Sequence, residues 1–106
     1  MSRKDQILEL LQDSPEDSFL HFALAKEYEN EGKPIQAQQA YQWILDHTPD
    51  YVGAYYHLAH LYWDQLQDKP AARQTIEAGI LVAQRINDPH AASELKSALM
   101  NLNLED

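Results

Sequence analysis

The sequence contains no cysteine, which excludes disulfide bonds, thiol nucleophiles and zinc sites built on thiolates. It also has no apolar run that approaches the ~18 residues of a membrane-spanning helix. The first residues do not lead into the apolar stretch of a secretion signal. We therefore expect a cytoplasmic protein without a membrane partner.

Basic residues are scarce: Lys and Arg number 8 against 17 Asp and Glu, which leaves a formal net charge of -9. Because nucleic-acid affinity comes mostly from neutralising phosphates, this balance argues against a nucleic-acid partner. Glycine occurs only 3 times, and Val, Ile and Thr are few, whereas Ala, Leu, Gln and Glu dominate. These abundant residues favour helix, and 106 residues suit one all-α domain with a single core.

The chain repeats itself at an offset of 34 residues. The recurring landmarks are Ser14-Pro15 with Thr48-Pro49, Leu24-Ala25 with Leu58-Ala59, Tyr28 with Tyr62, and Ala37 with Ala71. Such a period is typical of stacked helical hairpins. Ser14, Thr48 and Asp88 each precede a proline and are predicted N-caps, because proline fits the first position of a helix.

These landmarks divide the predicted single domain, residues 1–106, into four parts. An N-terminal helix over 1–13 precedes a first repeat over 14–47, a second repeat over 48–87 and a C-terminal capping helix over 88–106. Pro89 follows Pro49 by 40 residues, so we expect the last helix of the second repeat to be longer by more than a turn. The cap is needed because the last apolar face would otherwise meet water.

At these positions the sequence resembles the tetratricopeptide repeat family. The family's aromatic, Leu, small and Tyr positions correspond to His21, Leu24, Ala25 and Tyr28, and then to Tyr55, Leu58, Ala59 and Tyr62. In the second helices Ala37 and Tyr41 match, whereas the second repeat keeps Ala71 but has Thr75 in place of the ring. The resemblance implies an all-α fold of antiparallel helix hairpins, about six helices stacked as a short right-handed superhelix.

The resemblance also implies a concave surface, lined by the first helices of the repeats, that holds protein segments. The residues give independent support, because the helix predicted over 50–65 carries a second stripe at Tyr56, His60 and Trp63. We therefore expect a protein–protein interaction module or adaptor whose partner is a peptide or protein segment. The predicted partner-binding residues are Phe19, Phe22, Lys26, Tyr56, His57, His60 and Trp63.

Self-association is the alternative. The second stripe could pack against the N-terminal helix or a second copy of the chain, and Trp43 lies on an outer helix where an exposed ring would be unexplained. Met100 and Leu104 could add an end-on contact. On this interpretation the protein is a structural homodimer or assembly subunit with no separate peptide ligand.

Catalytic and metal-binding motifs are weak. His57, His60 and Asp64 have helical spacing that suits zinc, but three ligands on one helix do not close a site, so no metal is predicted. There is no nucleophile elbow, phosphate-cradling glycine loop or paired His–Glu zinc motif. We expect neither an enzyme nor a cofactor.

Overall fold

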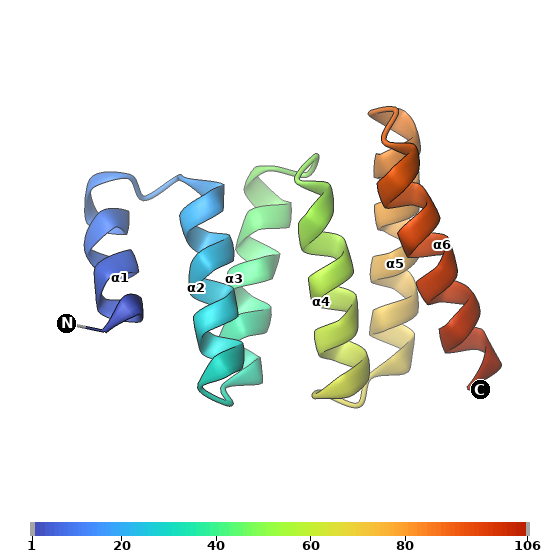
Figure 1. The fold of residues 1–106 in the computed structure, drawn as a ribbon, viewed down its shortest axis with the longest axis horizontal. Helices are drawn as coiled ribbons and strands as arrows, with labels where there is room; N and C mark the ends of the chain where they lie inside the picture. Colours follow the sequence, from blue (N-terminus) through green and yellow to red (C-terminus); the bar gives the residue numbers. More distant parts are fainter. Residues whose placement is uncertain (1, 106) are drawn as a thin grey trace.

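The computed structural model describes residues 2–105, so Met1 and Asp106, the two ends of the predicted domain, lie outside the described part. Six helices follow one another: α1 (Arg3–Asp13), α2 (Ser18–Asn30), α3 (Pro34–His47), α4 (Val52–Asp64), α5 (Lys69–Arg85) and α6 (Pro89–Leu104). They stand side by side in a row, with α3 behind α2 and α5 behind α6 in Figure 1. The predicted all-α stack of about six helices is confirmed over the described residues, which contain no strand.

The two Ser/Thr-Pro landmarks mark turns rather than helix starts, so the predicted N-caps Ser14 and Thr48 are wrong. Ser14 is the C-cap of α1, and Thr48 is the C-cap of α3. Each opens a tight turn with proline in its second position, closed by a bond from the Asp17 N–H to the Ser14 carbonyl at 3.2 Å and from the Tyr51 N–H to the Thr48 carbonyl at 3.0 Å. Proline suits that position because its ring presets the backbone angle of the turn.

Aspartates cap three of the helices. The carboxylates of Asp17, Asp68 and Asp88 each accept a hydrogen bond from the backbone N–H three residues later, at 3.2, 3.0 and 3.0 Å. This satisfies one of the amide groups that a helix leaves unpaired at its start. Asp88 is therefore confirmed as an N-cap.

The second hairpin has one residue more in its turn than the first. Residues 31–33 join α2 to α3, whereas residues 65–68 join α4 to α5. Gly32 (φ 71°) and Gln67 (φ 55°) occupy the corresponding left-handed position. Equivalent residues of α3 and α5 are consequently 35 apart, not 34.

This shift corrects the predicted repeat alignment in α5. The fully buried partner of Ala37 is Ala72 rather than Ala71, and Ile76 rather than Thr75 takes the place of Tyr41. An apolar side chain therefore fills the position where the alignment at 34 finds only a threonine. Helix α5 has 17 residues and α3 has 14, so the excess is less than one turn and the predicted longer extension is wrong.

Helix α4 joins two apolar clusters into one continuous interior. The first cluster consists of Ala25, Ala37, Ala40, Tyr41, Ile44, Ala54, Leu58 and Leu61. The second consists of Tyr55, Ala59, Ala72, Ile76, Val82, Leu95, Ala98 and Leu102. Alanine recurs where helices meet because close approach leaves room for little side chain. Two faces of α4 are thereby used for the fold, and a third remains for other contacts.

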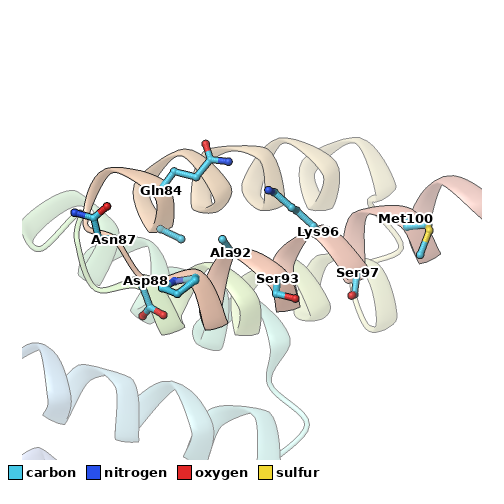
Figure 2. Close-up of a pocket in the computed structure, with 10 residues that line it drawn as sticks. Gln84, Asn87, Asp88, Ala92, Ser93, Lys96, Ser97 and Met100 are labelled. Carbon is cyan, nitrogen blue, oxygen red and sulfur yellow. The ribbon is translucent and has the colours of Figure 1, made fainter.

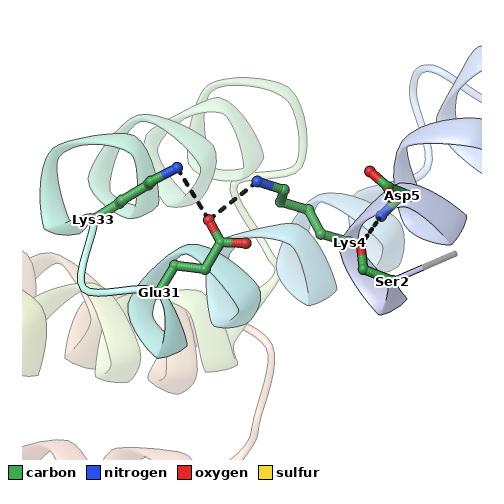
Figure 3. A network of polar contacts seen from close by, with 5 residues as sticks. All are labelled: Ser2, Lys4, Asp5, Glu31 and Lys33. Atoms are coloured by element: carbon green, nitrogen blue, oxygen red, sulfur yellow. Dashed lines mark hydrogen bonds and ion pairs between the residues drawn. The ribbon is translucent and has the colours of Figure 1, made fainter.

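Helix α1 is attached to the turn between α2 and α3. Ile7 is buried, while the Lys4 ammonium reaches the Glu31 carboxylate at 3.1 Å, where Lys33 also binds at 3.2 Å (Figure 3). The hydrogen bond from Lys4, followed by that from Lys33, lowers the pKa of Glu31. Surface ion pairs contribute little, so Ile7 is the main anchor of α1. No helix within residues 2–105 is long and apolar enough to cross a bilayer.

Candidate functional site

Helices α2, α4 and α6 share one side of the molecule, which we call the α2/α4/α6 face. The Phe22 ring of α2 meets the His57 ring of α4 edge-on, with centroids 5.1 Å apart. Next to it, the Lys26 ammonium lies 3.5 Å from His57 Nδ1. Helix α4 in turn contacts α6 directly. The face therefore consists of two junctions, one between α2 and α4 and one between α4 and α6.

Most of the predicted binding residues lie at these two junctions. Phe22, Lys26 and His57 meet at the α2–α4 junction, and Tyr56, His60 and Trp63 lie at the α4–α6 junction. Phe19, on the first turn of α2, is 67% exposed. The Tyr56 ring also meets the His57 ring at a centroid distance of 5.8 Å, so the two groups are in contact, and Phe19 is not among these contacts.

The α2–α4 junction is built mainly by packing between the two hairpins. Phe22 is half-buried, and its ring contacts those of Tyr41 and Tyr51, each at a centroid distance of 5.8 Å, as well as His57. Burial, and then the charge of Lys26, lower the pKa of His57. Phe22 and His57 therefore contribute to the packing between the hairpins, and His57 also lines a small hollow between α4 and α6 beside Tyr56.

A cavity of about 330 Å³ lies at the α4–α6 junction. Its walls are formed by Tyr56, His60, Trp63, His90, Ser93, Glu94, Ser97, Ala98 and Asn101. The His60 ring contacts two neighbouring rings of α4, with centroids 4.6 Å from Tyr56 and 5.7 Å from Trp63. This cavity combines flat apolar surfaces with polar groups, as small-ligand and side-chain pockets do.

The two ring nitrogens of His60 have different surroundings. Its Nδ1 lies 3.7 Å from an Asp64 carboxylate oxygen. Its Nε2 is covered by protein atoms and has no hydrogen-bond partner. A buried polar atom without a partner is unusual, because its desolvation is not compensated.

The three residues with zinc-like spacing do not converge. His57 is turned toward α2, where its Nδ1 meets Lys26, while His60 lines the α4–α6 cavity and Asp64 lies beside His60. Within residues 2–105 no group of three or more His, Asp or Glu side chains is placed to hold a metal ion.

Sequence reasoning treated α6 only as a cap and so missed its share of the cavity. Its polar side chains His90, Glu94, Ser97 and Asn101 recur at i, i+4, i+7 and i+11, which places them on one helical face. His90 Nε2 lies 2.6 Å from a Glu94 carboxylate oxygen. The sequence shows that polar stripe beside the apolar one that begins at Leu95, but only the structure shows that it faces α4.

Trp43, the ring that suggested self-association, has partners within the chain. It stacks between His21, at a centroid distance of 3.6 Å, and His47, at 3.9 Å. His21 is held by a contact of 2.8 Å from its Nε2 to the Pro15 carbonyl. The ring therefore needs no second copy to cover it, although Met100 and Leu104 at the other end remain exposed.

A larger cavity, about 830 Å³, lies elsewhere, at the C-terminal end of the stack. Figure 2 shows Gln84 in the last turn of α5 and Asn87 in the turn that follows it, with Lys96 and Met100 farther along α6. In longer repeat arrays the next hairpin packs on such an end. We therefore regard this cavity as the open end of the stack.

Several solved structures are similar to this chain. A tetratricopeptide repeat domain protein from Salinibacter ruber, solved in solution, is 35% identical with a TM-score of 0.78 and covers 83% of this chain and 88% of its own. A crystal structure of a tetratricopeptide repeat domain protein from the same organism is 31% identical with a TM-score of 0.76, and the alignment covers 85% of this chain and 99% of that one. A protein from Bordetella parapertussis is 27% identical with a TM-score of 0.85, and the alignment covers 100% of this chain and 91% of that one.

A more distant structure shares the fold alone. The TPR2B domain of yeast Sti1, in its complex with pHsp70, is 16% identical with a TM-score of 0.86, and the alignment covers 97% of this chain and 82% of that one. No protein-family model matches the sequence, and no curated protein does.

Proposed function

The chain belongs to the tetratricopeptide repeat family, and on that premise we propose that it is an interaction module that binds an extended protein segment on the α2/α4/α6 face. Protein interaction in general is what the similar domains support. The position of the partner rests on the residues of this chain.

The observation that carries this proposal is the pair of half-buried aromatic rings beside the α4–α6 cavity. Tyr56 and Trp63 pack against the second apolar cluster on one side and line the cavity on the other. Large rings that are fixed by packing and still offer surface lose little conformational freedom on binding, and they are typical anchors of interfaces. Phe19, exposed on α2, extends the same face.

The test is a peptide-display selection against the intact chain, followed by titration of the selected peptides with single variants. We expect Trp63→Ala and Tyr56→Ala to weaken binding about tenfold or more, as truncated interface anchors do. Leu81→Ala is the matched control, because Leu81 is a large exposed side chain (68%) on α5. Circular dichroism must show unchanged helix content in all three.

Two results would overturn the proposal. One is a set of selected peptides whose affinity is the same for the control and for both ring variants. The other is a stable dimer in sedimentation that the Trp63→Ala change dissociates, which would favour the alternative of a self-associating structural protein.

A further inference from the structure

We propose that the α4–α6 cavity receives an arginine side chain of the partner segment. This inference rests on the proposed function of the same face and specifies the chemistry of the partner. Three features of the cavity carry it: its lining, the unpartnered nitrogen of His60, and its charge.

The lining offers a guanidinium group both aromatic surface and hydrogen-bond acceptors. The rings of Tyr56 and Trp63 provide aromatic surfaces, and the Glu94 carboxylate, the Ser97 hydroxyl and the Asn101 amide provide acceptors. A guanidinium is planar, stacks on aromatic rings and presents five N–H donors. About 330 Å³ is enough for one long side chain with its head group.

The nitrogen of His60 indicates a donor. The tautomer with its proton on Nδ1, on the side of the Asp64 carboxylate 3.7 Å away, has an acceptor at Nε2. That nitrogen is covered by protein atoms and has no partner. An N–H group satisfies this acceptor once the atoms that cover it move aside, whereas a carboxylate does not.

The charge around the cavity favours a cation. Its lining residues include one carboxylate, Glu94, which His90 contacts at 2.6 Å, and no Lys or Arg. Asp64 adds a second carboxylate next to His60, and the net charge of the chain is -9. Lys26 lies at the other junction, where it contacts His57 and Glu29, so it does not neutralise this end. Arginine suits the site better than lysine, because an ammonium group lacks the planar surface that stacks on rings.

The experiment uses synthetic Ser/Ala peptides of about nine residues, capped at both ends, with one central residue. That residue is arginine, its neutral analogue citrulline, lysine or glutamate. Binding to the full chain is followed by NMR through the Trp63 indole N–H and the His60 ring. We expect the arginine peptide to shift both signals and the citrulline peptide to bind about tenfold more weakly.

Charge variants give the second measurement. Glu94→Gln should weaken the arginine peptide several-fold. Glu9→Gln removes the same charge from an exposed site on α1 and should leave the affinity unchanged. Equal binding of arginine and citrulline, stronger binding of glutamate, or no shift with any of the four peptides would overturn the arginine site.

The outcomes separate this inference from the proposed function. If display-selected peptides lose affinity with Trp63→Ala but show no dependence on arginine, the interaction face stands and the arginine pocket falls. If Trp63→Ala changes the affinity of neither the display-selected nor the synthetic peptides, both the interaction face and the arginine pocket are wrong.

Discussion

The two hairpins follow one plan but fill their interiors differently. At equivalent positions the first hairpin has Ile44 on α3 and the second has Gly79 on α5. Ile44 is fully buried and fills its own space. Around Gly79 the space is filled from outside, because a Cβ there would lie 2.7 Å from the Tyr55 Cβ and 3.0 Å from Leu95 Cδ1. The two hairpins thus share a backbone arrangement, but they differ in which helix provides the side chains that fill the interior.

The largest expected loss of stability comes from a substitution in the first hairpin. Ile44→Ala removes a fully buried side chain whose neighbours belong to two hairpins, so the cavity that is left cannot collapse easily. We expect a loss of about 2–5 kcal/mol in the free energy of unfolding. Urea unfolding followed by circular dichroism measures it. A loss under about 1 kcal/mol would mean that this interior repacks freely.

The same alanine in the second hairpin tests overpacking instead. Gly79→Ala places a methyl group against Tyr55 and Leu95, and its nearest obstacle is the rigid Cβ of Tyr55 rather than the end of a flexible side chain. We expect a loss of about 1–3 kcal/mol in the same urea measurement, since α5 must move away from α4 or α6.

Gly53→Ala is the matched control for Gly79→Ala. Gly53 also lies in a helix, but a Cβ there would meet nothing within 4 Å. Helix propensity alone then applies, and stability should rise by less than the roughly 0.5–1 kcal/mol of a mid-helix glycine, because Gly53 is the second residue of α4. If both glycine variants changed stability in the same direction, close packing at Gly79 would not explain its presence.

The contrast between the hairpins also explains how far the sequence could be read. The offset of 34 correctly aligned α2 with α4, because both helices keep Leu and Ala at the same contact positions. It failed in α5, since Leu66 lies in a turn that is one residue longer, and a single inserted residue moves every later side chain by 100° around a helix. The pairing of Ala72 and Ile76 with the first hairpin becomes visible only when the turn is seen.

The candidate site was predictable only in part for a related reason. Periodicity placed Tyr56, His60 and Trp63 on one face of α4 correctly. It could not show which helix faces them, because polar residues on α6 look the same whether they meet solvent or another helix. Nor could it show that Phe22 and His57 face each other, since that contact depends on how the hairpins cross.

Substitutions in the turns within the two hairpins should have the next smaller effect on stability. Gly32 and Gln67 share a left-handed backbone, which glycine adopts without strain and other residues adopt at a cost. Gln67→Gly should therefore stabilise the protein by about 1 kcal/mol, and Gly32→Ala should destabilise it by about the same amount. Thermal unfolding of the two variants beside the parent chain tests this. Opposite shifts are required, and a loss with Gln67→Gly would show that the Gln67 side chain contributes more than its backbone costs.

The smallest expected effect concerns the contact between the hairpins, and it depends on pH. His57 of α4 lies against Phe22 and Tyr41 of the first hairpin. Burial first, and the Lys26 charge second, lower the pKa of His57 below its ordinary value of 6.5. As the pH falls through 6.5, the unfolded chain binds a proton at His57 before the folded chain does. The contribution of this residue to stability is therefore present above that pH and is lost below it.

Two variants separate the causes of this pH dependence. The parent chain should lose more stability between about pH 7.5 and about pH 5.5 than His57→Gln, in which the titrating ring is absent. Lys26→Gln removes the smaller cause and should reduce that loss only in part. Urea unfolding of the three proteins at both pH values measures the differences. Because burial by the first hairpin is the larger cause, equal losses in all three would mean that the two hairpins do not enclose His57.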